Sequence, residues 1–178
     1  MLTTKKIKIT MLTEEQRQFM LEEVSSEMIA AAQQINLAER YQSLLARFPK
    51  REGDFNPRLS STEQRAIIAQ YPHPVRFYKG QGGYYLLNEK KTAFPHMNLM
   101  MEMRQWVCCN INLWRDNKRV GGGYQYIALA ERLSRGEIFT WDDWRVPTQP
   151  WTYDEEQFNT VIAEYFFLYE DLCQQIPN

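Results

Sequence analysis

The chain lacks the long apolar runs that membrane proteins need. No segment approaches the ~20 apolar residues that cross a bilayer, and the opening MLTTKKIKIT leads into the charged stretch TEEQRQ instead of the apolar core of a signal peptide. Cysteine is also scarce: the three cysteines include the adjacent pair Cys108 and Cys109 and give no disulfide framework. We therefore expect a cytosolic protein with reduced thiols and no membrane partner.

Residue types that support catalysis or metal binding are few. His73 and His96 are the only histidines, and each lies beside a proline in a turn-like segment, so we expect both at the surface. The spacings C-x-x-C and H-E-x-x-H are absent, as is the nucleophile motif G-x-S-x-G. The sequence therefore predicts no metal and no cofactor, and it favours a binding role over an enzymatic one.

Charge is distributed unevenly along the chain, although the net charge is −1. Residues 1–72 have a net charge of +1, residues 73–119 of +5 and residues 120–178 of −7. A basic middle portion followed by an acidic end predicts a polarised surface, and such a surface governs partner choice and association rate. The length of 178 residues suits a single globular domain spanning residues 1–178.

Helical patterns account for most of the chain. Thr13 and Gln16 have the spacing of a capping box, and apolar residues then recur every three or four positions as far as Phe48. This pattern predicts one helix, or two helices that meet near Asn36. Further helices are expected from a capping box at Ser60 and Glu63 to Tyr71, from the glycine run to Gly136, and from a capping box at Thr152 and Glu155 to Ile176.

Two segments alternate as strands do. VRFYKGQGGYYLLN predicts a hairpin near residues 74–88, and KKIKIT predicts an edge strand near residues 5–10. The stretch NLMMEMRQWVCCNINLWRDN fits both periods: its length favours a helix in its first half, whereas residues 106–114 are compatible with helix or strand. Together these elements predict a helix-rich α+β fold with about five or six helices and one small antiparallel β-sheet.

The triglycine run is the least ordinary motif in the sequence. Lys118 and Arg119 precede Gly121, Gly122 and Gly123, which lead into a predicted helix. Free N–H groups at a helix N-terminus bind phosphate, and glycines let an anion approach the backbone closely. The complete phosphate-loop patterns G-x-x-x-x-G-K-[ST] and G-x-G-x-x-G are nevertheless absent. Two interpretations therefore remain: a plain joint before a helix, which the missing motifs favour, and an anion site.

The predicted hairpin tip interleaves cations with aromatic residues. Arg76, Tyr78 and Lys79 lie there, and such a mixture can hold phosphates and stack on bases. The same residues also suit the surface of an ordinary soluble hairpin. Together with the triglycine run they give our alternative hypothesis, a nucleotide- or nucleic-acid-binding protein that could be an enzyme.

The segment from Glu137 to Phe158 combines tryptophans and carboxylates with one cation, Arg145. Tryptophan is typical of the dominant contacts in protein interfaces, and carboxylates would attract a partner with a basic surface. The other interpretation is that the tryptophans pack into the core and the acids favour the N-terminus of the last helix. The candidate partner-binding residues are Trp141, Asp142, Asp143, Trp144, Trp151, Asp154 and Glu155.

These features favour a non-enzymatic, cytosolic protein-interaction module. We expect it to bind, and thereby inhibit, another protein with a basic surface, in the way that bacterial immunity proteins and antitoxins cover a site built for phosphates. The acidic, aromatic segment would make the contact, because opposite charge speeds association and aromatic anchors hold the complex.

Overall fold

The computed structural model describes residues 11–51, 59–79, 83–87, 94, 96–103, 106–115, 118–139 and 149–176. Within these ranges the protein has six helices and one five-stranded antiparallel sheet, which confirms the predicted helix-rich α+β fold. None of these helices is long and apolar enough to cross a membrane. The helices are α1 (Glu14–Val24), α2 (Ser26–Gln34), α3 (Leu37–Arg47), α4 (Ser61–Ile68), α5 (Tyr124–Ser134) and α7 (Glu155–Gln175). The strands are β1 (Val75–Tyr78), β2 (Tyr84–Leu87), β3 (Met97–Met103), β4 (Val107–Arg115) and β5 (Lys118–Gly123).

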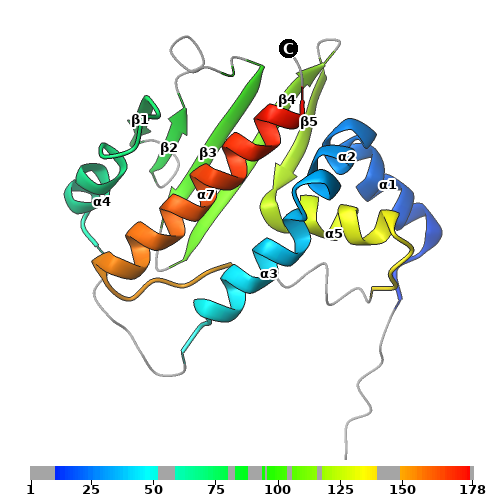
Figure 1. The fold of residues 1–178 in the computed structure, drawn as a ribbon, viewed down its shortest axis with the longest axis horizontal. Helices are drawn as coiled ribbons and strands as arrows, with labels where there is room; N and C mark the ends of the chain where they lie inside the picture. The colour runs from blue at the N-terminus through cyan, green and yellow to red at the C-terminus, as the bar shows by residue number, and fades with distance from the viewer. Residues whose placement is uncertain are drawn as a thin grey trace, which may run out of the picture.

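The strands follow one another in the sheet in chain order, so β1 and β5 are its edges. The predicted hairpin is confirmed, because Val75 of β1 lies opposite Leu87 of β2 in an antiparallel pair. The edge strand expected near residues 5–10 lies outside the described residues. Figure 1 shows α7 crossing the front of the sheet over β3, with α3 alongside, and a hydrophobic core fills the space between helices and sheet.

The helix favoured for the first half of NLMMEMRQWVCCNINLWRDN is wrong, because this stretch forms β3 and β4. Burial follows a period of two: along β4, Val107, Cys109 and Ile111 are buried and the residues between them are only partly covered. Leu99 of β3 lies directly opposite Ile111. Methionine is compatible with a helix as well as with a strand. Pairing within the sheet selects the strand period of two over the helical period of 3.6.

The N-terminal helical segment is divided twice. Its capping box is confirmed, since the N–H groups of Gln16 and Thr13 each donate to the other residue's side-chain oxygen. α1 ends at Ser25, where φ is 74°, and α2 gives way to α3 at Asn36, where φ is 52°. Positive φ values leave the right-handed helical region. The break expected near Asn36 is therefore present, and the sequence analysis missed the second break at Ser25.

The capping box predicted at Thr152 and Glu155 for the long helix α7 is wrong, because the helix begins later. The N-cap is Asp154, whose carboxylate accepts a 2.8 Å hydrogen bond from the N–H of Gln157. Thr152 lies before the helix, and Glu155 is the first helical residue. A carboxylate can cap as a hydroxyl does, and its charge also favours the positive end of the helix dipole.

Buried tyrosines fasten α7 to the sheet. The Tyr165 hydroxyl donates to the carbonyl oxygen of Val107 at 2.8 Å, and that of Tyr169 donates to Met97 at 3.0 Å. At the start of α5, Tyr124 donates to the carbonyl oxygen of Tyr165 at 2.8 Å. Burial raises the pKa of Tyr124 and Tyr165 well above the ordinary value, so both hydroxyls remain donors.

Both histidines lie in turn-like segments, as expected, but each is partly buried and packs against α7 or the residue that follows it. His73 stacks on Phe166 with 4.5 Å between ring centroids, and its Nε2 lies 2.8 Å from Oε1 of Glu170. His96 donates from Nε2 to the carbonyl oxygen of Ile176, where α7 has just ended, at 2.9 Å. The flat imidazole ring can cover an apolar surface while its nitrogen keeps a polar partner, and position beside a proline gave no sign of this packing.

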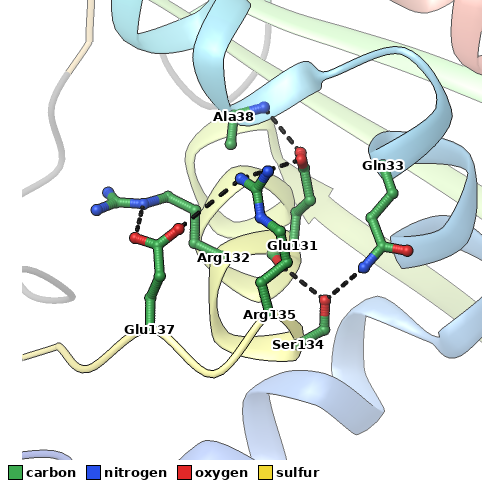
Figure 2. A network of polar contacts seen from close by, with 7 residues as sticks. All are labelled: Gln33, Ala38, Glu131, Arg132, Ser134, Arg135 and Glu137. Carbon is green, nitrogen blue, oxygen red and sulfur yellow. Dashed lines mark hydrogen bonds and ion pairs between the residues drawn. The ribbon is translucent and has the colours of Figure 1, made fainter.

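A buried carboxylate completes the N-terminus of α3, where Asn36 makes no side-chain cap. Glu131 of α5 accepts a 2.8 Å hydrogen bond at Oε2 from the N–H of Ala38. Its other oxygen lies 3.3 Å from Nη2 of Arg135, a contact drawn in Figure 2. The whole side chain is buried. Burial raises the pKa of the Glu131 carboxyl, and the Ala38 N–H and Arg135 oppose that rise. The buried Glu131 carboxylate thus links α5 to the N-terminus of α3.

We expect Glu131→Ala to lower the free energy of unfolding by about 2–3 kcal/mol, because the Ala38 N–H would be buried without its acceptor. Glu131→Gln keeps an acceptor oxygen and should be milder. Since the folded pKa of Glu131 is raised above 4.5, ionisation opposes folding. Wild-type stability should therefore fall relative to Glu131→Gln as the pH rises through that folded pKa.

Urea unfolding of the three proteins between about pH 4 and pH 7 measures both effects. Comparison of Glu131→Ala with Glu131→Gln separates the effect of the lost hydrogen bond from that of the lost charge, because only the alanine variant lacks an acceptor oxygen. A difference between wild type and Glu131→Gln that stays constant across this pH range would contradict the assigned cost of ionisation.

Candidate functional site

A pocket of about 290 Å³ opens between α1 and the edge strand β5. Contacts between these two elements place α1 beside the end of the sheet (Figure 1). The lining comes from α1, β4, β5 and the first turn of α5, so only the folded chain brings it together. The lining residues are Phe19, Met20, Glu23, Val24, Asn110, Gly121, Gly122, Gly123 and Tyr126.

The triglycine run leads directly into a helix, as expected, and it is itself part of a paired strand. Gly121 lies opposite Asn112, and Gly123 lies opposite Asn110, in the antiparallel pair of β5 with β4. Gly123 is also the N-cap of α5 and supplies no side-chain cap. The run therefore carries the chain directly from the sheet edge into a helix, and all three glycines line the pocket.

The three glycines are not equally necessary to the fold. Gly121 has a φ of 117°, and a Cβ atom added there would collide with the carbonyl oxygen of Ile111. A Cβ atom at Gly123 would lie 3.3 Å from Oδ1 of Asn110, a tight approach. At Gly122 the nearest atom would be Cβ of Tyr126 at 3.5 Å, which is ordinary van der Waals contact. The backbone thus requires a glycine at position 121 and not at position 122.

Aromatic rings and acceptor oxygens mark the rim of the pocket. The side chains of Phe19 and Tyr126 are 54% and 42% exposed, high values for such large apolar groups. Glu23 contributes a carboxylate, and Asn110 points Nδ2 toward Sγ of Cys108 at 3.9 Å and Oδ1 toward the glycine strand. Among the described residues that line the pocket there is no lysine, arginine or histidine. A cation therefore fits this lining better than an anion does.

The exposed side of α1 adds further carboxylates beside the pocket. Glu15, Glu22 and Glu23 lie four residues before, three after and four after Phe19, which places them around its ring on one helix face. All three glutamates are exposed. The only cation of the helix, Arg17, already forms an ion pair with another glutamate of α1. Phe19 is thus an exposed aromatic residue within a ring of carboxylates.

The two halves of the alternative, nucleotide-binding site lie at opposite edges of the sheet. Arg76 and Tyr78 belong to β1, with Lys79 directly after it, whereas Lys118 and Arg119 belong to β5. Four steps between neighbouring strands separate the edges by roughly 19 Å. Lys118 and Arg119 also occupy the far end of β5 from the glycines and do not line the pocket. The structure therefore does not gather these residues around one phosphate.

Only part of the predicted acidic, aromatic site falls within the described ranges. Trp151 is half-buried, contacts Trp106 with 5.3 Å between ring centroids, and lies under Nζ of Lys50 at 5.1 Å. Asp154 caps α7, and Glu155 is exposed in its first turn. Trp151 and Asp154 therefore have packing and capping roles. Trp141, Asp142, Asp143 and Trp144 lie outside the described residues.

Several acids of the last portion pair within the fold. Asp171 and Glu164 of α7 form ion pairs with Arg40 and Arg47 of α3. Glu137 forms an ion pair with an arginine of α5 at 2.8 Å (Figure 2). The net charge of −7 in residues 120–178 is thus partly neutralised by cations from earlier in the chain.

The cysteines are poorly suited to nucleophilic chemistry. Burial raises the pKa of the Cys108 and Cys109 thiols and brings that of Cys173 to about 12. The reactive form of cysteine is the thiolate, so thiols with raised pKa values are weak nucleophiles at neutral pH. Across the described ranges, no three His, Cys, Asp or Glu side chains gather as a metal site would require. We therefore take the pocket and α1 as the candidate binding site.

The chain matches no protein-family model, no curated protein and no solved structure in our comparisons. A functional conclusion must therefore come from the residues of this chain.

The sequence analysis missed Phe19, Glu23, Asn110 and Tyr126 as site residues. One signal was available, because Phe19 precedes Met20 and so lies off the buried face of a helix whose exposed positions are otherwise polar. The others meet only because β4, β5 and the first turn of α5 are brought to α1 by the fold. No local spacing could have indicated that contact.

We expect Gly121→Ala to lower the free energy of unfolding by about 2–4 kcal/mol, because the backbone must leave a left-handed conformation and relieve a collision. Gly122→Ala should leave stability unchanged or raise it by up to about 1 kcal/mol, since alanine restricts the unfolded chain. Thermal and urea unfolding of the two variants measure the contrast. Equal losses from both substitutions would contradict the assignment of different roles to the two glycines.

Proposed function

We propose that this protein is a protein-interaction module that binds a basic segment of another protein through α1 and the adjoining pocket. The contact surface, which we call the α1 surface, consists of Glu15, Phe19, Glu22, Glu23 and Tyr126. The observation that carries the proposal is the exposed ring of Phe19, surrounded by carboxylates at the mouth of a pocket.

The chemistry of the α1 surface supports a basic protein partner. Helix α1 holds four glutamates and one arginine, and unlike charges across an interface accelerate encounter and select the partner. Exposed aromatic side chains at the centre of such a patch are typical of the residues that dominate binding energy. Carboxylates without an aromatic anchor would explain attraction but not retention of the partner.

Inhibition follows if the basic segment is the partner's own working surface, such as a site that holds phosphates. The free cysteines in the described ranges fit a reducing, cytosolic setting for this encounter. The acids and tryptophans at positions 141–144 stay a predicted second contact of the same chemistry. A nucleotide-binding function has less support, because no cation lines the pocket in the described part of the chain.

Photo-crosslinking in native cells tests the proposal. A benzophenone amino acid replaces Phe19, and a matched variant carries it at Phe167 of α7, whose exposure of 55% equals that of Phe19 within one per cent. We expect position 19 to capture one protein, through a peptide rich in lysine and arginine, and position 167 not to capture it. Identical products from both positions, or an acidic captured peptide, would sink the proposal.

Charge reversal supplies the second test. The triple variant Glu15→Lys, Glu22→Lys, Glu23→Lys should weaken binding to the captured protein by at least about tenfold, because attraction becomes repulsion. The control Glu155→Lys, Glu156→Lys reverses exposed charges at the start of α7. Isothermal titration of both variants decides: loss of binding in the control alone would assign the contact to the C-terminal acidic segment instead.

A further inference from the structure

Gly122 is a feature that the fold does not explain. Its backbone is not in the left-handed region, and a side chain there would meet Tyr126 only at ordinary contact distance. A glycine within a strand weakens it by roughly 0.5–1 kcal/mol relative to alanine. A side chain at position 122 would extend into the pocket, between β5 and Tyr126. The glycine at position 122 therefore leaves this space in the pocket open.

The size of the pocket limits what can enter it. Its volume of about 290 Å³ lies at the lower end of small-molecule sites, which span roughly 300–1,000 Å³. One long side chain or a small ligand suits this space. Because Phe19 is exposed where it lines the pocket, a partner that lies on α1 can reach the pocket.

The lining selects the charge of the occupant. The Glu23 carboxylate and the Asn110 amide oxygen accept hydrogen bonds, and Phe19 and Tyr126 offer aromatic faces. The first turn of α5 contributes a partial positive charge of about half a unit, which is smaller than the full charge of the carboxylate. A guanidinium group satisfies all of these features, because it is planar, permanently charged, stacks on aromatic rings and donates in several directions.

We propose that the pocket receives one arginine side chain of the partner, with its guanidinium group held by Glu23 and Asn110 against the rings of Phe19 and Tyr126. This inference rests on the proposed function and identifies the residue type that anchors the partner. Lysine is the less suitable occupant, because its compact ammonium group is strongly hydrated and does not stack as a plane. The neutral isostere citrulline keeps the shape of arginine without its charge.

Titration of the full, ¹⁵N-labelled chain with the capped peptide acetyl-Gly-Arg-Gly-amide tests the inference by NMR. We expect saturable shifts of the Gly121, Gly122 and Gly123 amide signals. The citrulline peptide should bind at least about tenfold more weakly, and the lysine peptide should also be weaker. Equal binding of arginine and citrulline peptides, equal binding of arginine and lysine peptides, or no saturable shift at all would overturn the assignment.

Two variants tie the binding to the pocket. Gly122→Leu should fill the space and weaken arginine-peptide binding by at least about tenfold, and circular dichroism should show an unchanged fold. Glu23→Gln, at an exposed position, gives the same test if Gly122→Leu does not fold. Undiminished binding in the folded variant would overturn the inference. Partner capture at Phe19 that persists in Gly122→Leu would leave the proposed function standing and reject the arginine pocket alone.

Discussion

The rest of the structure depends on three hydrogen bonds from buried tyrosine hydroxyls to backbone carbonyl groups. Tyr165 and Tyr169 extend from α7 to the sheet, and Tyr124 extends from α5 to α7. A hydroxyl in the core must find an acceptor, because an unsatisfied polar group there is strongly unfavourable. The bonds to Val107 and Met97 therefore fix both the rotation of α7 and its position along the strands. Apolar packing alone would allow neighbouring arrangements with similar burial.

This constraint reaches the pocket through Tyr124. That residue is the first of α5 and follows the glycine strand directly, so its bond to α7 fixes the direction in which the chain leaves the sheet. The same first turn carries Tyr126 to the pocket rim. Glu131, further along α5, binds the N-terminus of α3. One helix thus links the sheet edge, the N-terminal helices and α7, and its first turn holds Tyr126 at the pocket.

Local chemistry allowed much of the fold to be predicted. The boxes at Thr13 and Ser60, the hairpin at β1 and β2, and the end of α5 near Gly136 depend on neighbouring residues, and all are present. The first half of the segment that forms β3 and β4 was predicted wrongly as a helix, because its period of two becomes visible only when the strands pair. The candidate site was harder still. It joins four elements, and two acids of the last portion of the chain pair with arginines of α3.

Gly121 and Gly122 are adjacent, yet the fold makes different demands on them. One glycine is held by its backbone conformation, whereas the next has room for a side chain that would point at Tyr126. Substitutions at position 122 can therefore adjust the depth of the pocket by single methyl groups while the strand stays as it is. If the proposed arginine pocket is the binding site, one substitution at position 122 would change which partner side chain fits it. An engineer could use the same position to graft a new specificity onto an unaltered scaffold.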